Sequence, residues 1–125
     1  MTLLLGALSP AFIFHATIGT MQADPVLQSF LKGIQPYRGE IRTIYLFGSR
    51  ARGDFLPDSD YDLLVVAKEK DFTLKDKIYD VLTDVSLEFN RDLSMKFFSQ
   101  AEFERLRTIP SRFVQTVLKE GIKLG

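Results

Sequence analysis

The sequence contains no cysteine, a single histidine and no excess of charge of either sign. Without cysteine the chain forms neither a disulfide nor a thiolate-ligated metal site, and one histidine is too few for a histidine-rich site. Any metal ion must then be held by carboxylates, which favour a hard cation such as Mg²⁺ or Mn²⁺. The 16 basic and 16 acidic residues cancel. This balance argues against a surface built for non-specific nucleic-acid binding, although a local basic patch stays open.

Charge is also missing from the first twenty residues, which contain no acidic or basic side chain apart from His15. Glycine and proline interrupt the apolar run, so it falls short of the roughly 20 unbroken apolar residues of a membrane span. It also lacks the positively charged start of a secretory signal. We therefore expect a cytoplasmic protein without a membrane segment, with residues 1–20 as an apolar extension and Met21 as the functional start. An extra packed segment and a weak signal or membrane-surface anchor are the alternatives.

Residues 21–125 are enough for one small domain and leave no room for a second. Runs rich in β-branched and aromatic residues predict strands over 41–47, 60–67 and 92–98. The second run ends in five consecutive apolar residues, as expected for a strand that is buried on both faces. Apolar residues at helical spacing predict helices before, between and after these strands. The order predicts an α/β (α+β) domain with helices packed against a small mixed β-sheet.

Three of the predicted helices have start signals in the sequence. Asp24 can cap a helix that has Pro25 at its first position. Ser99, with Glu102 three residues later, has the spacing of a capping box. Ser111 opens the last predicted helix after a proline, and a glycine closes it. A longer amphipathic helix is expected over about residues 73–89.

A glycine–serine pair ends the first predicted strand and opens a polar segment. Gly48 lets the backbone approach a ligand closely because it has no Cβ, and Ser49 adds a hydroxyl and a backbone N–H. If a helical turn begins at Arg50, its N-terminal amides form an anion site that suits phosphate. Such a pair is also common in ordinary turns, so by itself it leaves both interpretations open.

Two aspartates, Asp60 and Asp62, stand at the start of the second predicted strand. The two-residue period of a strand places both carboxylates on one face, roughly 6–7 Å apart at the backbone. Like charges this close repel one another, and a bound cation is one reason to tolerate them, whereas a solvated strand end is the other interpretation. Tyr61 then points to the opposite face, where core packing is its expected role. Ten residues separate Ser49 from Asp60, so the loop brings a phosphate cradle beside a metal cradle.

Gly48-Ser49, the ten-residue spacer and Asp60-x-Asp62 together resemble the hallmark motif of the DNA polymerase β-like nucleotidyltransferase superfamily. The fuller string GSRARGDFLPDSDYDLLVV is similar to that of its small prokaryotic branch, the minimal nucleotidyltransferases. Apolar strands flank the motif on both sides, as in that family. The resemblance covers about residues 26–124 and implies the polymerase β-like nucleotidyltransferase fold.

The resemblance implies a role for each motif residue. Gly48 and Ser49 contact the triphosphate, and Asp60 and Asp62 ligate Mg²⁺. A third carboxylate in this family comes from a later strand and helps to activate the attacking hydroxyl, and Asp92 is its best match here. The alternative for Asp92 is an ordinary strand-end carboxylate.

Two arginines flank the predicted phosphate cradle. Arg50 and Arg52 can pair with phosphate oxygens, and we favour Arg52 as the nucleotide-binding one. Solvation, or a bridge to Asp54 or Asp58, is the alternative for both arginines.

The implied reaction moves NMP, expected to be AMP from ATP, onto a hydroxyl with the help of two Mg²⁺ ions. The chain is too short for the extra helical domain with which larger relatives bind an acceptor, so we expect the acceptor on a separate chain. In the family, minimal nucleotidyltransferases resemble antitoxins that pair with a helical HEPN-domain protein, which they can inactivate by transferring AMP to a tyrosine.

Two other functions stay open. The chain can act as a non-catalytic antitoxin that neutralises its partner by contact, with little nucleotide turned over. It can also transfer a nucleotide to a small hydroxylated molecule, although the missing acceptor domain counts against this. A homo-oligomer is compatible with each of these functions.

Overall fold

The structure is a computed structural model that describes residues 24–57 and 59–125. The extension expected over residues 1–20, the start expected at Met21, and Asp58 as a candidate partner of the arginines lie outside the described residues. None of the helices in the described part is long and apolar enough to cross a membrane.

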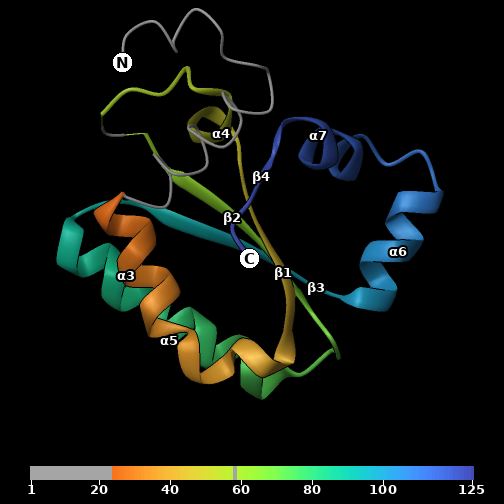
Figure 1. The fold of residues 1–125 in the computed structure, drawn as a ribbon, viewed down its shortest axis with the longest axis horizontal. Coiled ribbons are helices and arrows are strands. Elements are labelled where there is room, and N and C mark those ends of the chain that lie inside the picture. Colours follow the sequence, from red (N-terminus) through yellow and green to blue (C-terminus); the bar gives the residue numbers. More distant parts are fainter. Residues whose placement is uncertain (1–23, 58) are drawn as a thin grey trace, which may run out of the picture.

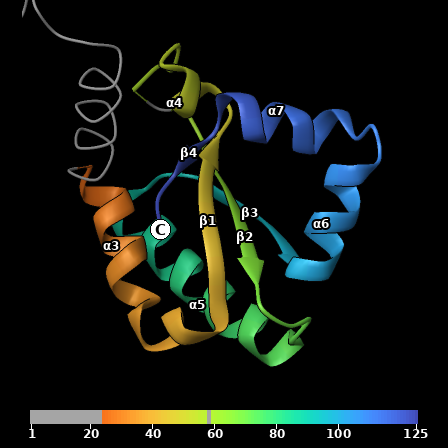
Figure 2. The same ribbon diagram turned by 45° about the vertical axis from the view of Figure 1, so that its right-hand side comes forward.

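The described residues form a sheet with a layer of helices on each face (Figures 1 and 2). The elements, in chain order, are α3 (Pro25–Gly33), the 3₁₀ helix η1 (Gln35–Glu40), β1 (Ile41–Phe47), α4 (Ser49–Arg52), β2 (Tyr61–Ala67), α5 (Phe72–Phe89), β3 (Leu93–Ser99), α6 (Gln100–Thr108), α7 (Arg112–Glu120) and β4 (Ile122–Lys123). The prediction of an α/β (α+β) domain is confirmed.

The strands lie in the order β3-β2-β1-β4. β2 and β3 run parallel, and α5 connects them, whereas β1 is antiparallel to both β2 and β4. The sheet is therefore mixed, as predicted. The prediction missed η1 and β4, which are too short to carry a periodic pattern.

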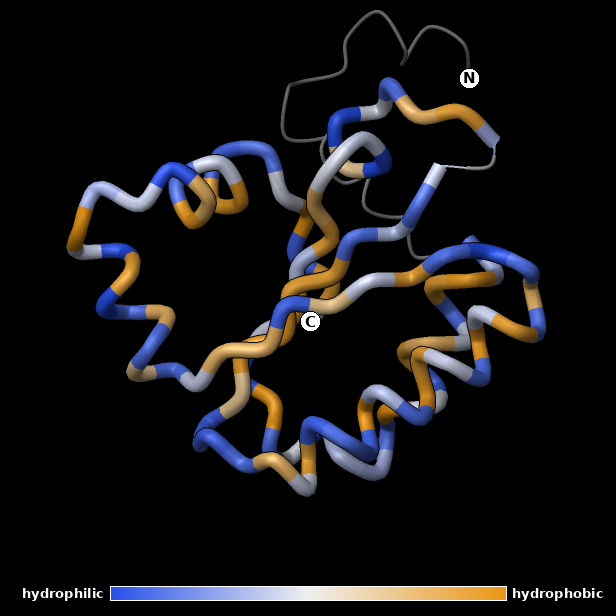
Figure 3. The backbone as a smooth tube through the Cα atoms, turned by 180° about the vertical axis from the view of Figure 1, so that it is seen from behind, coloured by the Kyte–Doolittle hydropathy of each residue, from blue (hydrophilic) through white to orange (hydrophobic). Residues whose placement is uncertain are grey.

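The sheet divides the core into two clusters, one on each face. Helices α3 and α5 cover one face, where Leu63 and Val65 of β2 are fully buried. Helices α6 and α7 cover the other face, where Leu64 and Val66 pack with Phe103. The expected burial of β2 on both faces is confirmed. Figure 3 shows hydrophobic residues concentrated along the central strands and alternating with hydrophilic ones along the helices.

The predicted helix starts are present with their caps. The Asp24 carboxylate accepts from the backbone N–H of Val26 at 2.8 Å, and α3 begins at Pro25. Ser99 and Glu102 form the capping box of α6 through reciprocal side-chain and backbone bonds. These local bonds satisfy N–H groups that have no partner within the helix.

Candidate active site

The end of β1 and the starts of β2 and β3 meet at one edge of the sheet (Figure 1). Phe47, the last residue of β1, lies opposite Asp62 in the antiparallel pair with β2. Asp62 in turn lies opposite Ser94 in the parallel pair with β3. The backbone N–H of Tyr61 donates to the carbonyl oxygen of Asp92 at 2.9 Å, which continues the pairing toward the sheet edge. The motif and the later aspartate are thereby brought to one place.

Two of the three predicted ligand aspartates lie just before the strands rather than within them. β2 begins at Tyr61 and β3 at Leu93, each one residue later than predicted. The pairing of β2 with β3 begins at Tyr61 and Leu93, so Asp60 and Asp92 each lie one residue before the first paired positions. Asp60 and Asp92 are both exposed at this edge.

Asp62 is held from β3 by a side chain that the sequence analysis did not single out. The Ser94 hydroxyl donates to Asp62 Oδ1 at 2.8 Å, across paired positions of the two strands. This bond fixes one carboxylate oxygen and the orientation of the group. The alternation of β2 sends Tyr61 to the other face, where it is 3% exposed. Its predicted role in core packing is confirmed.

Gly48 touches Asp62, and its backbone conformation is one that other residues rarely adopt. Its φ is 76° and its ψ is −159°, a region that is essentially restricted to glycine. A Cβ at this position would collide with Asp62 Oδ2. The glycine thus leaves room for the carboxylate beside the phosphate cradle predicted at Gly48-Ser49.

The polar segment after Gly48 opens with a single helical turn, α4, as the phosphate-cradle interpretation requires. The Gly48 carbonyl accepts from the N–H groups of Ala51 and Arg52, each at 3.1 Å. The helix begins at Ser49, one residue earlier than expected. The N–H groups of Ser49 and Arg50 precede the first bond within the turn, so they are the donors that such a cradle offers. The assignment of Gly48 and Ser49 to nucleotide binding stays a prediction.

The two arginines of this segment have different environments. Arg50 is 5% exposed and lies against the loop that leads to Asp60. The side chain of Arg52 is 43% exposed and pairs with Asp54 at 3.4 Å and with Glu120 at 3.9 Å. Nucleotide contact by Arg52 stays a prediction, and in the described structure this side chain takes the bridged alternative. A side chain that binds phosphate needs donors that face an open site, whereas the donors of Arg50 face protein atoms.

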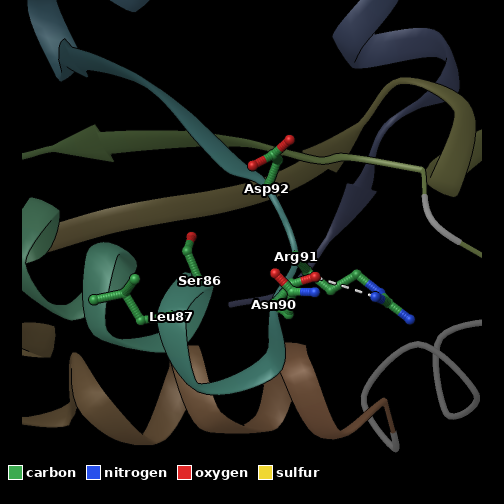
Figure 4. A pocket seen from close by; sticks show the side chains of 5 residues that line it. All are labelled: Ser86, Leu87, Asn90, Arg91 and Asp92. Carbon is green, nitrogen blue, oxygen red and sulfur yellow. Dashed lines mark hydrogen bonds between the residues drawn. The ribbon is translucent and has the colours of Figure 1, made fainter.

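A hollow of about 410 Å³ opens beside Asp92, between the end of α5 and the start of β3 (Figure 4). It is lined by Ser86, Leu87, Asn90, Arg91 and Asp92. Asn90 ends α5 in the left-handed conformation, with φ 51°. The Asp92 carboxylate and the Arg91 side chain extend in different directions in Figure 4. Leu87 is 77% exposed, so an apolar contact lies next to the candidate third carboxylate.

The residues of this edge fit a divalent cation by their chemistry. Carboxylate oxygens are the ligands that Mg²⁺ prefers. Ser94 holds one oxygen of Asp62, and the other lies beside Gly48, in the space that a Cβ would fill. Within the described residues, no three carboxylate or imidazole groups are close enough together to form a ready-made metal site. The assignment of Asp60, Asp62 and Asp92 as ligands stays a prediction.

Comparison with known proteins gives the family of this chain. Residues 30–124 match the family described as polymerase beta, nucleotidyltransferase. The protein named "Putative protein adenylyltransferase MJ0604" from Methanocaldococcus jannaschii is 33% identical over 102 residues, which are 81% of this chain and 96% of that protein. A second protein of that organism, "Putative protein adenylyltransferase MJ0141", is 29% identical over 83% of this chain and its own whole length.

Among solved structures, the fold is similar to a chain in a crystal structure of a toxin–antitoxin with AMP-PNP. The TM-score is 0.55 at 21% identity, over 78% of this chain and 71% of that one. The likeness confirms the fold that the motif implies. The motif, the edge where its two halves meet, and the match over residues 30–124 agree, and the chain belongs to the polymerase beta family of nucleotidyltransferases.

Proposed function

We propose that this nucleotidyltransferase is a Mg²⁺-dependent adenylyltransferase that moves AMP from ATP onto a hydroxyl of a separate protein. The observation that carries the proposal is the contact of Gly48 with Asp62. It joins a turn with free backbone donors to an edge with three carboxylates. A nucleoside triphosphate needs both, because its phosphate oxygens bind N–H donors and its metal binds carboxylates.

The proposed step forms one bond and breaks one. The acceptor hydroxyl oxygen attacks the α-phosphorus of ATP, and the bond from this phosphorus to the oxygen that bridges the α- and β-phosphates breaks. AMP stays on the acceptor, pyrophosphate leaves, and Asp92 takes the hydroxyl proton. Gly48 and Ser49 orient the triphosphate, and Arg52 pairs with its oxygens after leaving Asp54.

Asp60, Asp62 and Asp92 would hold the Mg²⁺ ions. Bound Mg²⁺ supplies charge neutralisation on the triphosphate and lowers the pKa of the attacking hydroxyl. The protein contributes position: Ser94 fixes Asp62, and the hollow beside Asp92 admits the acceptor to the carboxylate that receives its proton.

A protein acceptor is supported by the two archaeal relatives, both of which are named as protein adenylyltransferases. The fold neighbour with AMP-PNP belongs to a toxin–antitoxin, which supports a pair in which this chain is the antitoxin. The partner that we propose is a separate helical protein of the HEPN type, with a tyrosine as the acceptor.

The test is transfer of label from α-³²P-ATP in the presence of Mg²⁺, with the product of the neighbouring gene as the candidate acceptor. We expect label on the partner, and a loss of at least about 100-fold with Asp62→Asn, because an electrostatic group of the site is removed. Asp76→Asn on α5 is the matched control, since Asp76 is exposed and lies outside the sheet edge. Its rate should equal that of the wild type.

Two outcomes would contradict the proposal. Unlabelled partner that is still neutralised by the Asp62→Asn protein would show inhibition by contact alone. Label that appears on a small hydroxylated molecule and not on the protein would move the acceptor to another class.

A further inference from the structure

Arg50 is a charged side chain with almost no exposed surface. Burial of an unpaired guanidinium is costly, so its partners decide what it does. Its Nε donates to the carbonyl oxygen of Ser59 at 3.0 Å, and its Nη2 donates to the carbonyl oxygen of Pro57 at 3.0 Å. Both acceptors belong to the loop that ends at Asp60. The arginine therefore holds the main chain directly before a candidate metal ligand.

Two aromatic rings enclose the same guanidinium. Its Cζ lies 4.0 Å from the centre of the Tyr61 ring and 4.6 Å from the centre of the Phe55 ring. Both distances allow a cation–π attraction, which is stronger where water is excluded. Phe55 comes from the loop and Tyr61 from β2, so the arginine joins both flanks of Asp60.

A carboxylate from another element completes the surroundings. Asp24 Oδ2 lies 4.0 Å from Arg50 Nη1 and accepts the Tyr61 hydroxyl at 2.7 Å. The other oxygen of Asp24 caps α3. The loop is thus tied through one side chain to α3 and β2, as well as to α4, which carries the arginine.

We propose that Arg50 is a positioning residue that fixes Asp60 relative to the phosphate cradle. Arg50 follows Ser49 in the cradle turn, and its guanidinium holds the carbonyl group that precedes Asp60. The inference rests on the proposed function, because it concerns the metal ligand of that site. An arginine suits the task because its fork presents two donors in fixed geometry, whereas a lysine presents one flexible point charge.

The test compares Arg50→Lys with the wild type in two measurements on folded protein. One is Mn²⁺ binding, followed by the loss of the EPR signal of free Mn²⁺, and the other is urea unfolding. We expect Mn²⁺ affinity to fall about 10- to 100-fold, as for other groups that orient metal ligands. Arg105→Lys is the matched control, because Arg105 is exposed on α6, and its affinity should be unchanged.

Activity measured as a function of metal concentration separates a weakened metal site from a loss of stability. If Arg50 positions Asp60, raising the concentration of Mg²⁺ should restore much of the rate lost by Arg50→Lys. Should Arg50→Lys fail to fold, Phe55→Leu takes its place, since Phe55 is 37% exposed and lies outside the core. Loss of that ring should weaken Mn²⁺ binding about two- to fivefold.

The outcomes separate this inference from the proposed function. A wild-type protein that binds no Mn²⁺, with or without ATP, would overturn the proposed function. Wild-type binding with equal affinity in a folded but less stable Arg50→Lys protein would leave the proposed function standing and overturn the inference. If Phe55→Leu is used instead, an Mn²⁺ affinity equal to that of the wild type would likewise overturn the inference and leave the proposed function standing.

Discussion

The two faces of the sheet differ sharply where β2 and β3 begin. On the face toward α3 and α5, Tyr61 and Leu93 are buried. On the other face, Asp62 and Ser94 hydrogen bond to one another and keep contact with solvent. Along the same two strands, alternate residues therefore have different roles. Those on one face pack in the core, and those on the other face present polar groups to the candidate site.

The open face changes character within two residues of β2. Asp62 lies at the edge, and Leu64, the next residue on the same face, is fully buried beneath α6 and α7. Helices α6 and α7 lie on this face of the sheet (Figure 2), and Asp62 is only partly buried whereas Leu64 is fully buried. Along β2, only two residues separate Asp62 from the buried core. We therefore expect substitutions at the open edge to affect mainly metal binding, and substitutions among the buried residues to affect mainly stability.

Gly48→Ala should have the largest effect, because Gly48 directly follows β1, has a φ of 76° and touches Asp62. We expect a loss of about 1–3 kcal/mol from the backbone conformation, together with displaced Asp62 and weakened metal binding. Gly53→Ala is the matched control: its φ is 88°, but a Cβ there meets nothing within 4 Å. It should cost about 1–2 kcal/mol of stability and leave Mn²⁺ binding unchanged.

Urea unfolding and Mn²⁺ titration of both variants check this prediction. Equal losses of Mn²⁺ affinity at Gly48 and Gly53 would show that the contact with Asp62 has no special importance.

Ser94→Ala should affect function more than stability. The substitution removes the bond that orients Asp62 at an exposed position, so metal affinity should fall about tenfold or more. The free energy of unfolding should change by less than about 1 kcal/mol. Ser94→Thr, which keeps the hydroxyl, should restore binding. If Ser94→Ala binds Mn²⁺ as tightly as the wild type, Asp62 does not depend on β3 for its orientation.

Much of the fold, and part of the candidate site, could be predicted from local sequence patterns. The β1 range matches its prediction, and the capping box at Ser99 and Glu102 is present, because both depend on neighbouring residues. The proximity of Gly48 to Asp62 also agrees with the prediction, since a motif with fixed spacing encodes it.

The features that were missed depend on register and tertiary contacts. Ser94 meets Asp62 only because β2 and β3 pair in one of several registers that the sequence allows. Arg50 resembles a phosphate ligand in sequence, and its burial follows from Tyr61, Phe55 and a loop whose path is not local information. Short β4 gives no periodic signal, because it is two residues long.

Tyr61→Phe tests the face of the sheet that α3 and α5 cover. Burial, followed by the hydrogen bond to Asp24, raises the pKa of Tyr61 from 10.0 to about 12. The substitution keeps the ring against Arg50 and removes that bond, so it should cost about 1 kcal/mol near neutral pH. Mn²⁺ affinity should stay within about twofold, because this change is smaller than those of ligand-orienting groups.

The pH dependence gives a second check. The unfolded chain releases the Tyr61 proton near pH 10, whereas the folded protein retains it to about 12. The wild type should therefore lose its advantage over the variant as pH rises across this interval. A stability difference that stays constant from pH 8 to pH 12 would contradict a pKa of Tyr61 raised by burial and by the bond to Asp24.

Glu102→Gln should have the smallest effect and tests a carboxylate with a purely structural role at the other end of β3. Its Oε1 accepts from the backbone N–H of Ser99 at 2.9 Å and from Lys70 Nζ at 3.0 Å. The bond from Ser99, and then that from Lys70, lowers the pKa of Glu102 below 4.5. Glutamine retains a capping oxygen and loses the charge, so we expect a loss of about 0.5 kcal/mol at pH 7, as for an exposed ion pair.

This difference should shrink as the pH falls below 4.5, because protonation of Glu102 removes the same charge from the wild type. Glu104→Gln is the control on the same helix, where the partner Arg107 is well exposed and the pair lies outside the cap. Its effect should be smaller, and Mn²⁺ binding should be unchanged in both variants. A loss of Mn²⁺ affinity in Glu102→Gln would mean that the α6 end of the sheet and the aspartate edge are coupled. Asp60 and Asp92 are exposed at the sheet edge, and Asp62 beside them is partly exposed, whereas Glu102 is bound within the cap of α6. In the proposed function only the three aspartates bind metal, so substitution of Glu102 should leave Mn²⁺ affinity unchanged.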